Sequence, residues 1–472
     1  MRFESRFDKV TAAEAGIRAE DIRELLTSYT DGDIHEEVHA FCLLHRGRVI
    51  AEGAFSPFRM EERHELFSGT KALVGAAVGF AEAEGILSEE ERVADIFPDL
   101  LPENPSEELF SLRIRHLLSM SLGMEGQAVH TLSSLKAGEI PFSRIRAVLA
   151  RKFVHAPGEV FSYDNEASYL LSAIITKKTG LSLEEYLSPR LFAPLGIETP
   201  SFGKDKDGIC YGYIGARLTV EEYALLGELY RMDGVYGGKR ILPEGFVKKA
   251  ILKRIDTPPM PGADWGEGYA SHFWLGRHGS FRFCGAFGQM CAVFPQRELV
   301  FAVLSGADYF NIPHILEKFY DKILSRISPA PISPAEDGTL YRFTKDLTLP
   351  YRLSHIPPTI PRFEQTLFSV KPEGTFKTLR VSHSSDSLTL TLDGETVVSL
   401  GLRAPVRTVI DKTRTRFPYP TEVHDTVLCA SAYFESTDLL VAHLRVIGAP
   451  YALILRLSLS EKTAEFTPLR FM

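Results

Sequence analysis

The sequence predicts an α/β domain built on one antiparallel sheet. Strand-like alternation of apolar and polar residues occurs at residues 39–55 and again at 271–306. Helical periodicity fills most of residues 68–255 between them. Strands that come first and last, with helices between, indicate an antiparallel sheet made from both ends of the domain, flanked by helices and carrying an inserted helical part.

A third observation is the change of character after residue 327. The stretch SPAPISPAEDG at 328–338 has the composition of a linker. Beyond it lie β patterns with short turns, such as LTLTLDGETVVSL and YALILRLSLS. We therefore expect an α/β domain at 1–327, a linker at 328–338, and an all-β domain at 339–472 with the form of a small barrel or half-barrel.

Each element of the first domain is predicted from its local pattern. Residues 11–30 read as a helix, residues 39–55 as a hairpin with its turn at Arg46 and Gly47, and residues 311–327 as a final helix. Gly and Pro residues bound the helical segments between them, at 112–120, 142–153, 166–180, 182–196 and 219–232. The strands of 271–306 are joined by HG and PQR turns.

The composition limits the classes of function. The chain has 472 residues, 44% of them hydrophobic and 24% charged, and a net charge of −8 without a long run of Lys or Arg. This charge argues against nucleic acid or an anionic membrane as a partner. The longest apolar run, near residues 72–81, is too short to span a bilayer, and the N-terminal residues lack the apolar core of a secretory signal. We expect a cytoplasmic protein that does not associate with membranes.

The cysteines are few, scattered and odd in number, which favours reduced and mostly buried thiols. They are Cys42, Cys210, Cys284, Cys291 and Cys429. A disulfide between Cys284 and Cys291 stays open as an alternative.

One motif has the pattern of a zinc site. Residues His35 to His39 match H-E-x-x-H, in which two histidines one helical turn apart share a zinc ion. Asp31, Gly32 and Asp33 end the preceding helix, however, and His39 starts a strand. Four residues of extended chain span about 13 Å, which separates the two side chains. We expect no metal here; a helix at 34–44 would reverse this interpretation.

The pattern S-x-x-K occurs at Ser68/Lys71, Ser133/Lys136 and Ser201/Lys204. Only Ser68 opens a long apolar helix. Residues three apart on a helix are neighbours, so Lys71 would hold its amine beside the Ser68 hydroxyl. A lysine in an apolar helix is costly unless it is paired or neutral, and a neutral amine is a base that can activate serine. The alternative is a helix-capping serine and a lysine that extends to solvent.

A second constellation places Tyr163 and Asn165 just before another apolar helix, in the pattern Y-x-N. A phenol with its pKa lowered by a nearby ammonium can act as a general base, and an amide both donates and accepts hydrogen bonds to a substrate. The alternative is a core tyrosine and a capping asparagine. The same pattern recurs at Tyr309 and Asn311.

Taken together, these motifs resemble those of the serine β-lactamase and penicillin-recognising hydrolase superfamily, in particular class C β-lactamase-like esterases, D-aminopeptidases and 6-aminohexanoate-dimer hydrolases. Y-x-N follows S-x-x-K by roughly ninety residues, and a Gly-rich strand comes later. The segments RHLLSMSLGM, APGEVFSYDNEASYLLSAII, YLSPRLFAPLGIETPSF and GGKRILPEGFVKKAI are also similar to family segments. The resemblance covers about 1–327 and implies the β-lactamase/transpeptidase-like fold.

The resemblance implies a role for each residue of the first two motifs. Ser68 is the acylated nucleophile, Lys71 and Tyr163 share the proton transfers, and Asn165 orients Lys71 and the substrate. No metal or organic cofactor is implied.

The third motif departs from the family, whose relatives carry K-T-G or H-x-G on the strand that faces the serine. If Gly288 takes the place of the motif glycine, Ala286 stands where Lys or His would be. The N–H groups of Gln289 and Ser68 would then bind the oxyanion. The missing cation normally helps to bind a carboxylate of the substrate, so its absence disfavours β-lactams and D-Ala-D-Ala substrates; Met120, in place of a family histidine in RHLLSMSLGM, points the same way.

We therefore expect a serine hydrolase that forms an acyl-enzyme on Ser68 and acts on a small ester or amide. The alternatives are β-lactamase or D-amino-acid peptidase activity, and a non-catalytic binding or scaffold protein that retains the fold. Further candidates to line the cleft are Tyr211, Tyr213, Trp265, Trp274 and His64. The sequence does not indicate an oligomeric state.

Overall fold

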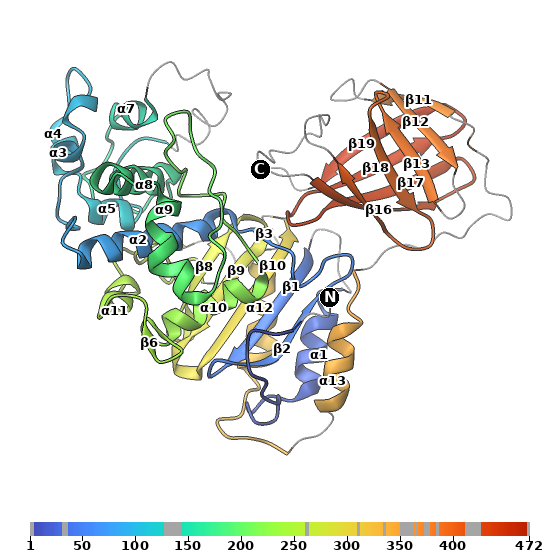
Figure 1. The fold of residues 1–472 in the computed structure, drawn as a ribbon, viewed down its shortest axis with the longest axis horizontal. Helices are drawn as coiled ribbons and strands as arrows, with labels where there is room; N and C mark the ends of the chain where they lie inside the picture. Colours follow the sequence, from blue (N-terminus) through green and yellow to red (C-terminus); the bar gives the residue numbers. More distant parts are fainter. Residues whose placement is uncertain are drawn as a thin grey trace.

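The computed structural model describes residues 4–30, 36–126, 143–259, 264–308, 312–333, 337–349, 363, 366–371, 378–383, 387–410 and 426–469. Figure 1 shows an α/β part, in which helices surround a sheet, and a barrel of strands beside it. No helix of these residues is long and apolar enough to cross a bilayer.

The α/β part contains a six-stranded sheet in the order β2-β1-β10-β9-β8-β7. Its strands are β1 (Glu36–His45), β2 (Arg48–Ala54), β7 (Trp274–Gly276), β8 (Ser280–Gly285), β9 (Gln289–Phe294) and β10 (Leu299–Ala307). Every pair in this sheet is antiparallel, and β1 pairs directly with β10. The predicted hairpin and the predicted sheet from both ends of the domain are therefore confirmed.

Alternate residues of the central strands face two separate hydrophobic cores. On β1, Phe41 and Leu43 pack on one face, whereas Cys42 and Leu44 pack on the other. The first face is covered by α1 (Ala19–Thr27) and by a helix at 312–324, whose α-helical part is α12 (Ile312–Phe319). The second face is covered by α10 (Val220–Arg231) and the inserted helices. Because both faces are covered, β1 is buried along nearly its whole length.

The helices between the two groups of strands follow the predicted order. They are α2 (Lys71–Ala83), α3 (Val93–Ile96), α4 (Glu107–Ser111), α5 (Ile114–Leu118), α7 (Arg144–Leu149), α8 (Asn165–Thr179), α9 (Leu183–Leu187), α10, and α11 (Phe246–Ala250). This part of the chain also contains two short antiparallel strand pairs: β3 (His64–Glu65) with β4 (Arg217–Leu218), and β5 (Val235–Tyr236) with β6 (Lys239–Arg240). The first helix is shorter than predicted: it begins at Ala19, because Gly16 has φ 75° and turns the chain before it.

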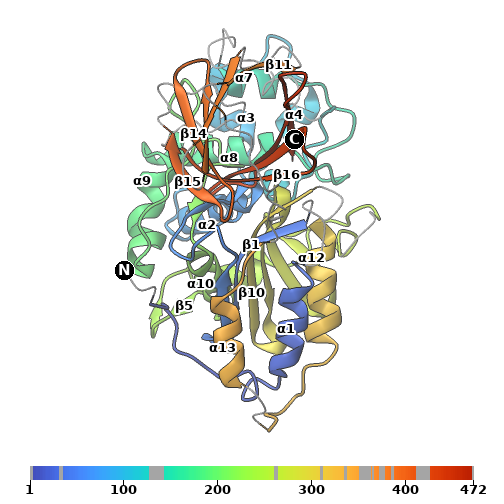
Figure 2. The same ribbon diagram turned by 90° about the vertical axis from the view of Figure 1, so that its right-hand side faces the viewer.

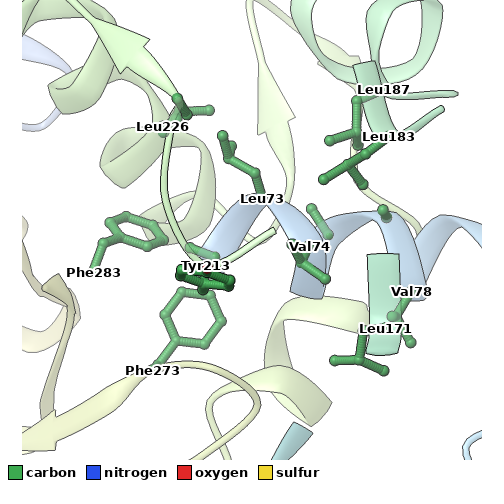
Figure 3. Packing of buried hydrophobic residues seen from close by; sticks show 14 of the residues in the cluster. Leu73, Val74, Val78, Leu171, Leu183, Leu187, Tyr213, Leu226, Phe273 and Phe283 are labelled. Atoms are coloured by element: carbon green, nitrogen blue, oxygen red, sulfur yellow. The ribbon is translucent and has the colours of Figure 1, made fainter. Parts of the chain in front are cut away.

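Helix α2 is buried on every side from Lys71 to Ala81. Figure 3 shows Val78 of α2 beside Leu171 of α8, and Leu183 of α9 close by. An apolar residue at every position, rather than on one stripe, is expected for a helix that other helices surround. The structure therefore holds the Lys71 side chain inside the protein.

An additional helix lies where the end of the linker and the domain boundary were predicted. Residues 328–333 run along the first domain, where the Ser328 N–H donates to Gly16 O at 2.8 Å. Helix α13 (Asp337–Lys345) then packs against β2 and α1, and Figure 2 shows it beside α1. Leu347 and Leu349 also join the core of the first domain. The predicted boundary at 339 thus falls inside α13, and these contacts favour a boundary after Leu349.

The remaining strands form a barrel. They are β11 (Thr366–Lys371), β12 (Thr378–His383), β13 (Ser387–Leu392), β14 (Thr396–Gly401), β15 (Val406–Ile410), β16 (Thr426–Phe434), β17 (Leu439–Val446), β18 (Ala452–Ser458) and β19 (Thr463–Leu469). Sheet order runs from β14 through β13, β12, β11, β19, β18 and β17 to β16, and Gly401 of β14 pairs with Ser431 of β16 to close the ring. The all-β prediction is confirmed.

Candidate active site

Ser68 lies in a short turn that precedes α2. Residues Phe67–Thr70 form one turn of 3₁₀ helix, and the α-helix begins only at Lys71. We had expected Ser68 to open the α-helix. It lies instead in the turn that precedes the helix. Phe67, the residue before it, has a left-handed backbone with φ 49°, which non-glycine residues rarely adopt. Ser68 is half-buried, so its hydroxyl sits on a tightly folded, partly accessible turn.

Lys71 contacts three oxygen atoms. Its Nζ lies 2.9 Å from Ser68 Oγ, 2.6 Å from Asn165 Oδ1 and 3.5 Å from the Tyr213 carbonyl oxygen. Only 1% of the residue is exposed. Burial holds the pKa of Lys71 well below its ordinary value, and the nearby Asp164 carboxylate opposes this only in part. The structure thus places a lysine that favours the neutral form beside the predicted nucleophile.

Tyr163 completes this group from the other side of Ser68. Its ring lies 4.8 Å from Lys71 Nζ, Trp274 stacks on it with the ring centroids 5.8 Å apart, and its hydroxyl interacts with Ser68. We had expected a nearby ammonium to lower the pKa of Tyr163. Burial instead raises that pKa well above its ordinary value, so that expectation is wrong and the phenol keeps its proton.

The start of α8 positions Asn165. Asp164 caps the helix by accepting a hydrogen bond from the Glu166 N–H at 2.9 Å. Its carboxylate also pairs with Arg151 at 2.6 Å, and Glu166 pairs with the buried Arg144 at 2.6 Å. These ion pairs anchor the first turn of α8, so the Asn165 amide is held against Lys71.

The third segment lies where β8 turns into β9. Gly285, the last residue of β8, passes against the Ser68 turn: a Cβ atom there would lie 2.0 Å from Leu66 O and 3.1 Å from Gly69 N. Gly288 instead faces away, since its Cβ would lie 2.4 Å from Ser305 Oγ. Gln289 is fully buried, and its side-chain amide bonds to the backbone of Ser305 at 2.7 and 3.1 Å.

We had assigned the third motif to Gly288 and Gln289. The structure instead places Gly285, three residues earlier, beside the serine turn. The glycine beside the serine turn is Gly285, and the residue that follows it is Ala286. The sequence spacing alone does not show which of the two glycines, Gly285 or Gly288, lies beside the Ser68 turn. The pairing of β8 with β9 decides which of them meets the turn, and Gly285 pairs with Gln289.

Sequence reasoning missed a cation on β8. Arg282 donates from Nη1 to Leu275 O at 3.1 Å, lies 4.7 Å from the centre of the Trp265 ring, and interacts with the Cys284 thiol. Cys284 interacts electrostatically with Tyr163, and its pKa is raised by burial. The signal was the alternation of the strand, which puts Arg282 and Cys284 on the same side of β8.

The other aromatic candidates divide into two groups. Trp274 reaches the site by stacking on Tyr163, and Tyr213 reaches it through its carbonyl oxygen. Trp265 packs against Trp274 at 4.6 Å, and Tyr211 packs against Tyr213 at 5.7 Å. His64 does not line the cleft: it is buried and bonds to His39 at 3.1 Å.

The zinc-like motif does not form a helix. Residues Glu36–His39 belong to β1, as the extended interpretation predicted, whereas His35 lies outside the described residues. Within the described part of the chain, no group of three His, Cys, Asp or Glu side chains could hold a metal ion. Among the other motifs, Ser133, Lys136, Tyr309 and Asn311 also lie outside the described residues, and Lys204 pairs with Glu184 at 2.7 Å.

Comparison with known proteins gives one family. Residues 31–321 match the family model described as Beta-lactamase. The chain is 24% identical over 325 residues to a 6-aminohexanoate-dimer hydrolase of Paenarthrobacter ureafaciens, a match that covers 64% of this chain and 81% of that protein.

Solved structures share the fold. A family VIII carboxylesterase is 15% identical with a TM-score of 0.52, over 69% of this chain and 100% of the other. The octameric penicillin-binding protein homologue of Pyrococcus abyssi is 18% identical with a TM-score of 0.50, over 92% of this chain and 96% of the other. This second match extends beyond the α/β part into the barrel.

Proposed function

Since the chain belongs to the Beta-lactamase family, whose relatives here are named as hydrolases, we propose that it is a serine hydrolase. The proposed reaction forms an acyl-enzyme on Ser68 and then hydrolyses it. The observation that supports this most strongly is the buried Lys71 amine at 2.9 Å from Ser68 Oγ. A neutral amine beside a half-buried hydroxyl is an arrangement suited to nucleophilic catalysis.

The contacts of Lys71 support an assignment of its protons. A neutral amine has two N–H donors and one lone pair. Asn165 Oδ1 at 2.6 Å and Tyr213 O at 3.5 Å can only accept hydrogen bonds, so they use the two donors. The lone pair then faces Ser68 Oγ and can take its proton.

Acylation follows from this arrangement. Ser68 Oγ attacks the carbonyl carbon of the substrate while its proton passes to Lys71 Nζ. Tyr163, which is protonated in the resting site, donates its proton to the departing alkoxide or amine and then regains a proton from Lys71. The C–O or C–N bond of the substrate breaks and the ester bond to Ser68 forms. Water then attacks the acyl carbon, and its proton passes through Tyr163 and Lys71 to Ser68 Oγ. The ester bond to Ser68 breaks, which releases the acid.

The negative charge on the carbonyl oxygen needs donors in the transition state. We assign this role to the backbone N–H groups of Ser68 and Ala286, since Gly285 lets β8 approach the serine turn. Among the backbone hydrogen bonds formed outside helices and strands in the described residues, neither N–H group is a donor. Both are therefore available to a substrate.

The proposed substrate is a small ester or amide without an obligatory carboxylate. The cation on β8, Arg282, donates to Leu275 O and interacts with the Cys284 thiol. A β-lactam or a D-amino-acid peptide is therefore the second candidate. Hydrolysis of a chromogenic cephalosporin at a rate above that of simple esters would reverse this order.

Intact mass after incubation with a fluorophosphonate tests the proposal. Attack by Ser68 forms a phosphorus–oxygen bond and expels fluoride, so the wild type should gain one adduct. The variant Ser68→Ala should gain none, whereas Ser201→Ala, which alters another S-x-x-K serine, should be labelled like the wild type. A folded wild type without an adduct would leave the non-catalytic binding protein as the better interpretation.

A further inference from the structure

The residues next to the two proposed oxyanion donors are both phenylalanines that point into the barrel. Phe67 precedes Ser68, and Phe287 follows Ala286. Their rings lie 5.1 Å apart and are nearly perpendicular. Both are buried, and both belong to the hydrophobic core of the C-terminal barrel rather than to either core of the α/β domain. The second domain therefore encloses a side chain from each of these two segments.

A residue of the barrel completes this contact. Tyr451 lies in the turn between β17 and β18, residues 447–451. Its ring lies 6.2 Å from Phe67 and 5.9 Å from Phe287, with edge-to-face geometry in both pairs. Such pairs add a favourable electrostatic term to the burial of their area. The three rings link the Ser68 turn, the Ala286 turn and the barrel.

Both phenylalanines have a strained backbone. Phe67 has φ 49° and Phe287 has φ 62°, in the left-handed region, which is unfavourable for a residue with a Cβ atom. A conformation of this kind persists only where its surroundings hold it. Burial of the two rings in the barrel core provides that stabilisation, because a relaxed backbone would withdraw the rings from their contacts.

Polar contacts hold the same turn of the barrel against the strand that leads to Ser68. The carbonyl oxygen of Gly448 accepts hydrogen bonds from the Glu65 N–H and from Arg217 Nη2, each at 3.0 Å. Gly448 has φ 77°, and a Cβ atom there would lie 2.6 Å from Arg63 O. Figure 1 shows the barrel meeting the α/β part near β3, which contains Glu65. The fit at this point leaves no room for a side chain.

Ion pairs keep the two domains in this arrangement. Arg445 of β17 bonds to Glu37 of β1 at 2.7 Å, and both side chains are only 3% exposed. Arg407 of β15 pairs with Glu62 and donates to Pro57 O at 2.8 Å. Removing one partner of a buried ion pair is strongly destabilising, so these pairs hold the barrel, and with it the 447–451 turn, against the α/β domain.

We propose that the 447–451 turn of the C-terminal barrel positions the acylation site, with Tyr451 and Gly448 as its positioning residues. The turn holds the Ser68 hydroxyl and the Ser68 and Ala286 N–H groups at the separation that the transition state requires. Neither residue touches the reacting atoms. This inference rests on the proposed function of Ser68, and it gives the second domain a role in the reaction of the first.

The first test compares Tyr451→Ala with Tyr451→Phe. The measurement is the rate of Ser68 labelling by a fluorophosphonate at several concentrations, which separates the limiting rate constant from the half-saturating concentration. We expect Tyr451→Ala to lower the limiting rate about 10- to 100-fold, as small displacements of reacting groups do, with the half-saturating concentration nearly unchanged. Tyr451→Phe retains the ring contacts, so its limiting rate should be close to that of the wild type.

The second test uses two glycines with nearly the same backbone. Gly448 has φ 77° and faces Arg63 O, whereas Gly394, between β13 and β14, has φ 81° and no atom within 4 Å of its missing Cβ. Both Gly→Ala changes add the same backbone strain within the barrel, but only Gly448→Ala displaces the turn. We expect Gly448→Ala to slow labelling about tenfold or more and Gly394→Ala to leave it close to the wild-type rate.

Three results would overturn the inference. Labelling of Tyr451→Ala and Gly448→Ala at the wild-type rate would show that the turn does not position Ser68. Equal losses in Gly448→Ala and Gly394→Ala would show that only the general stability of the barrel matters. A wild type that is not labelled would overturn the proposed function itself, and this inference with it. If Tyr451→Ala fails to fold, the pair of glycine variants decides.

Discussion

The Nζ atom of Lys71 lies 2.6 Å from the side-chain oxygen of Asn165, although the two residues are 94 positions apart in the chain. This contact joins the start of α2 to the start of α8. It orients the amine toward Ser68 Oγ, which lies 2.9 Å away. An amide oxygen accepts a hydrogen bond without adding the negative charge that would favour an ammonium, so burial remains the dominant effect on the Lys71 pKa.

The acidic side of the pH profile should report the protonation of Lys71. Its pKa is held well below the ordinary value by burial, and the proposed base is the neutral form. The labelling rate should therefore fall as the pH drops through the lowered pKa, at a pH below the range in which exposed lysines titrate. The measurement is the labelling rate of Ser68 against pH. A rate that rises only near pH 10 would contradict a neutral Lys71.

Asn165→Asp should move that acidic limb to higher pH. The substitution puts a carboxylate at 2.6 Å from Lys71 Nζ in place of the amide oxygen, and an opposite charge stabilises the ammonium. The rate at pH 7 should fall, while the rate at pH 9 to 10 should recover in part. Asn165→Ala is the control, because it removes the contact without adding charge. An unchanged limb in Asn165→Asp would show that Lys71 is not the titrating base.

Lys71→Met should strongly slow labelling of Ser68 and increase the free energy of unfolding at neutral pH. Loss of a general base lowers the rate about 10²- to 10⁴-fold. The unfolded chain binds a proton at Lys71 that the folded chain does not, so the wild type gains stability as the pH rises toward the ordinary lysine pKa. The advantage of Lys71→Met should therefore shrink by up to about 1.4 kcal/mol per pH unit in this window. Urea unfolding at pH 7, 8 and 9 measures it; a constant difference would contradict the lowered pKa.

Gly285→Ala and Gly288→Ala should have different effects. The first adds a Cβ 2.0 Å from Leu66 O, in the turn before Ser68, so we expect a loss of labelling of about 100-fold. The second adds a Cβ against Ser305 Oγ at φ 81°, away from that turn, so it should lower the melting temperature more than the labelling rate of the folded fraction. The reverse pattern would restore Gly288 as the glycine of the third motif.

Glu52→Gln should stabilise the protein above pH 7 and have less effect at pH 5. Burial and the neighbouring Glu221 raise the pKa of Glu52 to about 7. Since the folded state holds this proton more tightly than the unfolded state, wild-type stability falls as the pH rises from about 4.5 to 7. The glutamine amide cannot ionise and can still donate to Glu221. Melting temperatures at pH 5 and 8 test this, with about 2–4 °C expected per kcal/mol.

Much of the first domain could be predicted from the sequence because its signals are local. The hairpin at residues 39–55 alternates, and the apolar residues after Lys71 indicate a helix that is buried on every side. The separation of Ser68 and Lys71 by three residues is enough to bring their side chains together on one turn. Family-like segments then joined Tyr163 and Asn165 to the same site.

Other features depended on contacts between distant parts of the chain. Local spacing could not decide between Gly285 and Gly288, because strand pairing determines which of them meets Leu66. The pKa of Tyr163 depends on how completely the fold buries it, and burial acts against the effect of a nearby ammonium. Helix α13 crosses the predicted domain boundary because its apolar side packs on β2, which no pattern within residues 337–345 identifies.

The sequence alone determined the proposed nucleophile and base: a serine and a lysine three residues apart, at the head of an apolar segment that is buried. Only the tertiary structure decided what holds that chemistry in position. Phe67 and Phe287 look like ordinary core residues in the sequence, yet both lie in the core of the barrel with Tyr451. The physical reason is that a periodic pattern shows that a side chain is buried, but not which residues pack against it. For Phe67 and Phe287, contacts between the two domains determine those residues.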